Sequence, residues 1–192
     1  MKRAVQKRTL ETRAKLLTAA SDLVAGGGYQ SLRVEEVVLR AGVAKGTFFA
    51  HFNDKEALLE QLIAAEINAA LDRLEVADKP TNVNDLIKLL DPVMQVMTSE
   101  RYVFDLILRH SSATLLDKVG PIADTFGRFI LLIAEWFKTG RWRPDLDPYL
   151  VAEGVQSFAI NAMALNFCAL HCGVPTEDRM TTYMRAWLEP GQ

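Results

Sequence analysis

The chain has 192 residues, of which 49% are hydrophobic and 24% charged, a balance that predicts a packed core and excludes general disorder. No uncharged apolar run reaches the roughly 18 residues of a membrane span, and the basic N-terminus lacks the apolar segment of a secretory signal, so no membrane partner is expected. The charges divide into 10 basic against 5 acidic residues up to position 55, and 12 against 19 after it. Only the N-terminal third therefore suits a polyanion.

The first elements are predicted to be helices that end at glycines. Apolar residues recur at helical spacing along almost the whole chain and strand patterns are scarce, so the predicted fold class is all-α. A first helix covers about Leu10–Ala25 and ends at Gly26–Gly28. A second, short helix covers about Arg33–Ala41 and ends at Gly42, where a left-handed conformation is favoured.

Two short helices joined by a turn that contains glycine are typical of the helix-turn-helix motif. The second of them begins after Val43 and reaches about Phe52. Asp54 then offers an N-cap to a long helix that runs to about Val76. Further helices are predicted at about 83–98, 100–117, 121–139, 147–172 and 176–188.

The short helix that ends near Phe52 has one apolar side and one small, basic side. Phe48 and Phe52 stand four residues apart, so they share a face and should pack inward. Gly46 leaves room for a bulky group near the backbone, and Lys55 follows at the N-terminus of the next helix, where free N–H groups attract phosphate. Such an outward face fits a DNA major groove. An ordinary helical hairpin with solvated lysines has the same spacing.

The first fifteen residues hold six Lys and Arg residues and one acidic residue. Two interpretations fit this composition. The segment is either an arm that reaches the backbone or minor groove of DNA, or a solvated, disordered tail.

The run GVAKGTFFAHFNDKEAL, residues 42–58, closely resembles the signature of the tetracycline-repressor (TetR) family. Gly28-Tyr29 and residues 34–37 are similar to its earlier part, and the similarity at this detail covers about residues 9–62. Residues 141–148, RWRPDLDP, resemble the family's usual link into the penultimate helix. The resemblance implies a homodimeric regulator that binds double-stranded DNA. It further implies a three-helix helix-turn-helix domain at 1–54, and a helical domain at 55–192 for effector binding and dimerisation.

The resemblance also implies which residues contact DNA. The start of the recognition helix should approach phosphates and base edges, and the residues after it should contact the backbone. Phe49 stands where the family usually has Tyr. Ala44 stands where it usually has a capping Ser, and the loss of that cap costs about 1 kcal/mol. Arg33 replaces the usual Thr or Ser and is expected to make a charge-assisted phosphate contact. The predicted DNA-binding residues are Arg33, Lys45, Gly46, Thr47, Phe49, His51 and Lys55.

The helix predicted at 147–172 is apolar on all sides, which indicates burial all round. By the family resemblance, this helix and the one at 176–188 pair with their copies in a four-helix bundle. The alternative is a central core helix of a monomer. The predicted dimer contacts are Gly154, Phe158, Ala162, Leu165, Ala169 and Met184.

A second apolar group combines Met and aromatic residues on the preceding helices. Spacing alone favours core packing for such residues, whereas the resemblance implies a cavity for an unknown small, apolar or aromatic effector. Asn161 and Asn166, together with the edge residues Arg101, Arg109 and His110, are expected to hold the polar end of a ligand. The predicted pocket residues are Met97, Phe104, Leu108, Phe126, Phe129, Ile133, Trp136, Phe158, Asn161 and Asn166.

The sequence predicts no metal, no cofactor and no catalytic site. Cys168, His171 and Cys172 have helical spacing, but a structural zinc site needs four ligands, so buried cysteines are the simpler interpretation. Two cysteines are also too few for a disulfide scaffold, which favours the cytoplasm. Nucleophile-elbow, zinc-protease and dinucleotide motifs are missing. The predicted function is a ligand-responsive transcriptional regulator, most simply a repressor; an activator or architectural DNA-binder without effector, and a helical enzyme without cofactor, are the alternatives.

Overall fold

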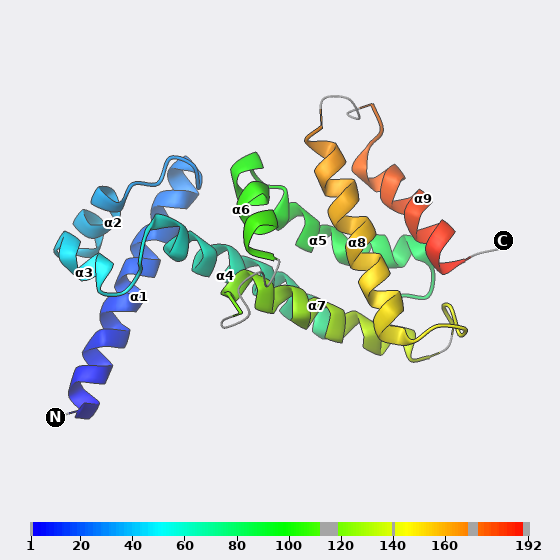
Figure 1. Ribbon diagram of the computed structural model, residues 1–192, viewed down its shortest axis with the longest axis horizontal. Coiled ribbons are helices and arrows are strands. Elements are labelled where there is room, and N and C mark those ends of the chain that lie inside the picture. Colours follow the sequence, from blue (N-terminus) through cyan, green and yellow to red (C-terminus); the bar gives the residue numbers. More distant parts are fainter. Residues whose placement is uncertain (1, 112–118, 140, 169–172, 190–192) are drawn as a thin grey trace.

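The computed structural model describes residues 2–111, 119–139, 141–168 and 173–189, and in this part of the chain every regular element is an α-helix. The all-α prediction is therefore confirmed. Figure 1 shows α1–α3 gathered at one end, α4 leading away from them, and α5–α9 forming the rest of the molecule. The bounds are α1 Lys2–Gly27, α2 Val34–Ala41, α3 Lys45–Phe49, α4 Lys55–Glu75, α5 Val83–Met97, α6 Arg101–Ser111, α7 Pro121–Phe137, α8 Pro148–Asn166 and α9 Thr176–Leu188.

Helix α1 is longer than predicted, because it begins at Lys2 and not near Leu10. The basic segment is not a disordered tail, because it forms the first half of a 26-residue helix; an arm that reaches DNA stays a prediction. Its residues are mostly strong helix formers, and neither Gly nor Pro interrupts them before Gly26. Lys7 and Glu11 add an ion pair across one turn, with Nζ and Oε1 3.9 Å apart.

The turn between α2 and α3 has the predicted glycine geometry. Gly42 adopts φ 67° and ψ 37°, the left-handed conformation, and its N–H points back to the last turn of α2. Helix α3 spans only five residues, fewer than predicted, although backbone hydrogen bonds continue the turn to Phe52. The helix stops early because Asp54 begins the next one: its side chain accepts a hydrogen bond from the N–H of Ala57 at 2.8 Å.

Helix α8 ends at Asn166, whereas the sequence predicted a helix to 172. Phe167 leaves the helix because its carbonyl accepts from Arg101 Nη1 at 3.3 Å and its ring lies 5.4 Å from that of Phe104. Helix α6 thus holds the end of α8. The other predicted bounds differ from the observed ones by at most two residues. The exception is the helix predicted at 100–117, whose predicted end lies outside the described residues.

Helix α4 forms the spine of the molecule. Its buried residues pack against α1 on the motif side and against α5, α6 and α7 on the other side. Helix α8 packs between α7 and α9, and α9 also reaches α5. Among the described residues, no helix combines the length and the apolar character that a membrane crossing requires. Helix α4 is consequently the direct connection between the helix-turn-helix motif and the C-terminal helices.

Candidate DNA-binding surface and effector cavity

The inward side of the motif is as predicted. Phe48 is fully buried and Phe52 is 3% exposed. Their ring centroids lie 5.5 Å apart, and the ring of Phe49 meets Phe48 edge-on at 5.3 Å. The burial of Phe48 and Phe52 fixes which side of this segment faces the core, and therefore which residues it presents outward.

The outward side of α3 is open. A Cβ built at Gly46 meets no atom within 4 Å, so a large partner has direct access to the backbone. Phe49 is 50% exposed, Lys45 is exposed, and the side chains of Thr47 and His51 are half-buried. The structure thus brings five of the predicted DNA-binding residues to one short segment. Ala44 makes no side-chain cap at the start of α3, as expected from the missing Ser.

An ion pair crosses this surface from α2 to α3. Lys45 Nζ lies 2.6 Å from Glu35 Oε1, with both side chains more than half exposed. The hydrogen bond from Lys45 lowers the pKa of the Glu35 carboxyl. Arg33 is exposed at the N-terminus of α2 without a capping hydrogen bond. Two cations therefore flank α2, and one of them is already paired with a carboxylate.

Lys55 lies in the first turn of α4 with its ammonium group 5.4 Å from the centre of the Tyr102 ring. Helix α6 also forms ion pairs with the first two turns of α4. Arg109 Nη2 lies 3.2 Å from Glu56 Oε1, and His110 Nδ1 lies 2.6 Å from an oxygen of Glu60. The predicted phosphate-binding lysine is thus held by a helix of the C-terminal region.

Sequence reasoning missed Arg13, which positions the turn between α3 and α4. Its guanidinium lies 4.3 Å from the centre of the Phe52 ring, and its Nη1 donates to the carbonyl of His51 at 2.9 Å. The only sequence signal is that Arg13 precedes the buried stripe of α1 by one turn.

A second missed residue is Glu100, in the link between α5 and α6. Its carboxylate accepts hydrogen bonds from the backbone N–H groups of Tyr29 at 2.8 Å and Gln30 at 3.3 Å. Gly28, at φ 81°, permits this approach, because a Cβ there would lie 2.7 Å from Glu100 Oε1. Tyr29 is 4% exposed, and burial together with the charge of Glu66 raises the pKa of its phenol. No local pattern pairs residues 71 positions apart.

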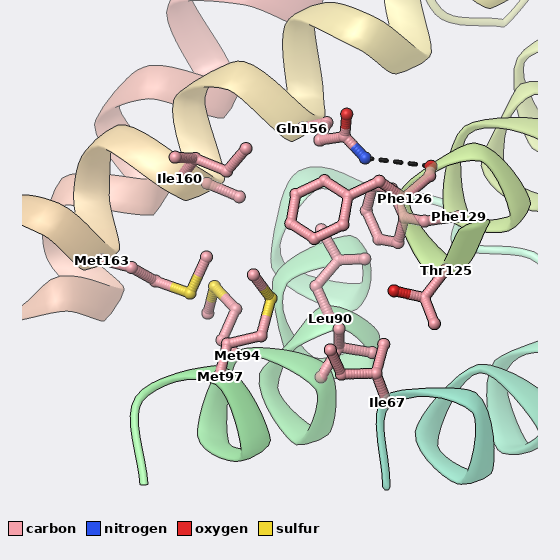
Figure 2. A pocket seen from close by; sticks show the side chains of 12 residues that line it. Ile67, Leu90, Met94, Met97, Thr125, Phe126, Phe129, Gln156, Ile160 and Met163 are labelled. Carbon is pink, nitrogen blue, oxygen red and sulfur yellow. Dashed lines mark hydrogen bonds between the residues drawn. The ribbon is translucent and has the colours of Figure 1, made fainter. Parts of the chain in front are cut away.

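A narrow apolar cavity lies between α4, α5, α7 and α8 (Figure 2). It encloses about 400 Å³, including space open to solvent, and little of this space is wide enough for a water molecule, so the cavity is a narrow slot. The polar side chains at its wall are already bonded: Thr125 donates to the carbonyl of Ile122 at 2.7 Å, and Gln156 to that of Phe126 at 3.1 Å. The lining residues are Ile67, Leu90, Val93, Met94, Met97, Thr125, Phe126, Phe129, Gln156, Ala159, Ile160 and Met163.

Three of the predicted pocket residues, Met97, Phe126 and Phe129, line this cavity. The other seven lie elsewhere. On α6, Phe104 packs on Phe167 and Leu108 is 39% exposed. On α7, Ile133 is fully buried and Trp136 borders an outer groove between α4 and α7. On α8, Phe158 packs against Tyr183 and Trp187, Asn161 accepts from Tyr183 Oη at 3.2 Å, and Asn166 is exposed. Helical spacing indicates a shared face, but not which neighbouring helix covers that face.

The edge residues Arg101, Arg109 and His110 are also away from the cavity. Arg101 pairs with Asp105 and the end of α8, and the other two contact α4. Helix α6 is thus a brace between α4 and α8 and contributes no side chain to the cavity wall.

The predicted dimer residues divide into three groups. Ala162 and Met184 are fully buried within the subunit, so they do not face a second copy. Gly154 lies against the ring of Trp187, Phe158 packs on the same ring, and Leu165 is half-buried. Ala169 lies outside the described residues. The apolar character of α8 on all sides therefore reflects, in part, packing between α7 and α9 of its own subunit.

In the described part of the chain, no three potential metal ligands come together. Cys168 is half-buried at the end of α8, and His171 and Cys172 fall outside the described residues.

Residues 16–62 match the family described as bacterial regulatory proteins, tetR family. The fatty acid metabolism regulator protein of Bacillus subtilis is 24% identical over 145 residues, covering 72% of this chain and 75% of the relative. An uncharacterized HTH-type transcriptional regulator of Haemophilus influenzae is 29% identical over 170 residues, which cover 84% of this chain and 80% of the relative. The structure of Thermus thermophilus FadR, a TetR family repressor in complex with lauroyl-CoA, covers 94% of this chain and 95% of that chain with a TM-score of 0.62 and 23% identity.

These relatives are transcriptional regulators, in agreement with the prediction that this chain is not an enzyme. The match covers the motif that forms the open surface of α3, and the structural similarity extends over the C-terminal helices. Residues 16–62 therefore belong to the tetR family of bacterial regulatory proteins, and the helices around them share the fold of solved TetR-family regulators.

Proposed function

We propose that the chain is a cytoplasmic repressor that binds a roughly palindromic operator as a homodimer and leaves it when an apolar molecule occupies the cavity. Residues 1–54 would bind DNA, and residues 55–192 the effector and the second subunit. One observation carries this proposal: the cavity wall and the DNA-binding unit are joined within a few residues. Met97 lines the cavity as the last residue of α5, and Glu100 holds the loop between α1 and α2.

On the DNA side, α3 enters the major groove with Gly46 and Thr47 closest to the base edges. Lys55 binds phosphate at the N-terminus of α4, and Arg33 does so from α2. Phe49 and His51 contact the backbone. Lys45 must exchange Glu35 for a phosphate, and this exchange costs little because an exposed ion pair contributes only about 0–1 kcal/mol.

The dimer contact is expected on the outer face of α8 and α9. Leu150, at 47% exposure, begins this face on α8 and Asn161 continues it. On α9, Tyr183 donates to Asn161, and Ala186 is exposed one turn further along. Tyr183 and Trp187 are half-buried there. A second copy would cover these apolar and aromatic groups, and a twofold axis would set the two α3 helices about 34–36 Å apart, or a multiple of that.

The effector is expected to carry a single unbranched alkyl or acyl chain. A slot with carbon and sulfur walls favours a thin, apolar ligand over a bulky ring system. The similarity to a fatty acid metabolism regulator, and to a repressor solved with lauroyl-CoA, supports an unbranched chain and does not bear on the head group. The sequence predicts an apolar or aromatic effector, and the shape of the cavity favours the compounds of this group that carry an unbranched chain.

Release of DNA would follow from displacement of the last turn of α5. A chain that fills the slot pushes on Met94 and Met97 in the last turn of α5, and Met97 stands three residues before Glu100. Movement of Glu100 changes how the α1–α2 loop is held, and Ile67 transmits the same strain to α4. A coupling of about 1–3 kcal/mol would lower operator affinity about 5- to 150-fold.

The test begins with operators selected as bound fragments of the host genome. Binding to one of them is measured by fluorescence anisotropy, with and without fatty acids and acyl thioesters of increasing chain length. We expect weaker binding at one range of chain lengths. Operator binding that no alkyl or acyl compound changes would instead favour a DNA-binding activator or architectural protein without effector.

A further inference from the structure

A groove runs along the outer side of α5 toward the start of α9. It encloses about 720 Å³, including space open to solvent. Met94 and Met163 line this groove and also the apolar cavity, so their side chains form the wall between the two spaces. The groove is lined by Ile87, Lys88, Asp91, Met94, Gln95, Thr98, Met163, Thr176 and Glu177.

Methionine makes this wall the weakest boundary of the cavity. Figure 2 shows Met94, Met97 and Met163 together at one end of the cavity, on the side away from Ile67 and Thr125. Methionine has three rotatable bonds and fills irregular gaps, so a change of rotamer opens a passage without moving a helix. The opposite end is closed by branched and aromatic side chains of α4 and α7.

The groove is polar where the cavity is apolar. Lys88, Asp91 and Glu177 are exposed along it, one cation against two carboxylates. Lys88 makes no ion pair with another described residue. Asp91 accepts a hydrogen bond from the amide of Gln95 at 2.5 Å, which fixes its carboxylate on the outer face of α5. An apolar slot that adjoins a polar groove through flexible side chains has the form of a site for an amphiphile.

We propose that the groove receives the polar end of the effector whose alkyl chain lies in the cavity, and that this end carries a positive charge. The inference rests on the proposed function, because it names the polar end of the same effector. A cationic head group in the groove is attracted by two carboxylates and repelled by one ammonium group. An anionic head group is repelled by the two carboxylates and attracted only by the ammonium group. A multiply anionic head is disfavoured most.

The preference for a cation is expected to be modest. All three charged side chains are exposed and screened by salt. The dipole at the N-terminus of α9 also offsets part of the charge of Glu177. We therefore expect decyltrimethylammonium to bind about two- to five-fold more tightly than decanoate, with decanol between them.

The experiment compares these three compounds, which share one chain length, by isothermal calorimetry below the concentrations at which they form micelles. The quantity of interest is the ratio of the decanoate and decyltrimethylammonium dissociation constants. Lys88→Glu should raise this ratio, and Glu177→Lys should lower it to one or less. Lys15→Glu, on the exposed side of α1 at the other end of the molecule, is the matched control and should leave the ratio unchanged.

Two failures are distinguishable. If the three compounds bind but the ratio is the same in wild type, Lys88→Glu and Glu177→Lys, the polar end lies elsewhere and this inference is wrong, while the alkyl effector stands. If none of the compounds binds, both the polar subsite and the alkyl effector of the proposed function are overturned. Thermal melting of each variant verifies that it is folded, as expected for exposed positions.

Discussion

The carboxylate of Glu100 accepts a hydrogen bond from the backbone N–H of Tyr29 at 2.8 Å, across 71 positions of sequence. The contact joins the end of the cavity wall to the loop that precedes the helix-turn-helix motif. It depends on Gly28, whose positive φ turns the loop and whose missing side chain leaves room for the carboxylate. This pair therefore offers the most direct tests of how the two parts of the molecule communicate.

Glu100→Ala should weaken the link between effector and DNA. The loss of two charge-assisted hydrogen bonds at a half-buried site is expected to cost about 1 kcal/mol of unfolding free energy. Anisotropy should show a smaller change in operator affinity on effector addition. Glu100→Gln keeps one acceptor and should lie between Glu100→Ala and wild type. Equal release in all three proteins would show that Glu100 is not part of the coupling.

Gly28→Ala and Gly46→Ala should separate stability from DNA binding. The Cβ at position 28 meets Glu100 and forces φ 81° on a non-glycine residue, which is expected to cost about 1–3 kcal/mol. The Cβ at position 46 meets nothing in the free protein, so thermal melting should be unchanged or slightly raised, whereas operator binding should fall. Normal operator binding by Gly46→Ala would argue against close approach of DNA at that helix face.

Lys45 and Glu35 should have opposite effects on DNA affinity. Lys45→Ala removes a phosphate partner, so operator binding should weaken and the slope of log affinity against log salt should flatten by about one unit. Lys55→Ala should do the same. Glu35→Gln releases Lys45 and removes a negative charge from the surface, so binding should tighten. Thermal melting should barely change in any of them, because these side chains are exposed or half-buried.

A dimer test must use the outer face of α8. Ala162→Glu would place a charge in the subunit core, where Ala162 has no exposed surface, so this variant should unfold instead of giving a folded monomer. Leu150→Glu and Ser157→Glu change exposed residues of the same helix. Sedimentation should show folded monomers for these two variants and dimers for wild type. A wild-type monomer at micromolar concentration would refute the dimer.

Filling the cavity should block the effector without harming DNA binding. Ala159 lines the slot and is 6% exposed, so Ala159→Met extends into the space where the alkyl chain is expected. This variant should bind operator as wild type does and no longer respond to effector. Leu131→Met is the control, because Leu131 is 57% exposed on the outer side of α7 and does not line the cavity, and it should respond normally. A normal response of Ala159→Met would place the effector elsewhere.

The sequence by itself determined the features that depend on nearby residues. The helical period, the left-handed Gly42, the cap at Asp54 and the inward pair Phe48 and Phe52 all arise from contacts within about four residues. The family motif lies in the same local stretch. For that reason the open surface of α3 was predictable in detail, whereas the length of α1 was underestimated only because its basic start lacks an apolar stripe.

The tertiary structure decided everything that depends on how helices are rotated against each other. A helix that is apolar on all sides does not reveal which side meets its own subunit, so the sequence predicts Ala162 at the dimer contact although it faces the core. The cavity residues come from four helices, and the bonds from Glu100 to Tyr29 and from Arg13 to the turn after α3 cross 71 and 38 positions. Such contacts form only when the chain is packed, because their geometry is fixed by the combined burial of many side chains and not by any local pattern.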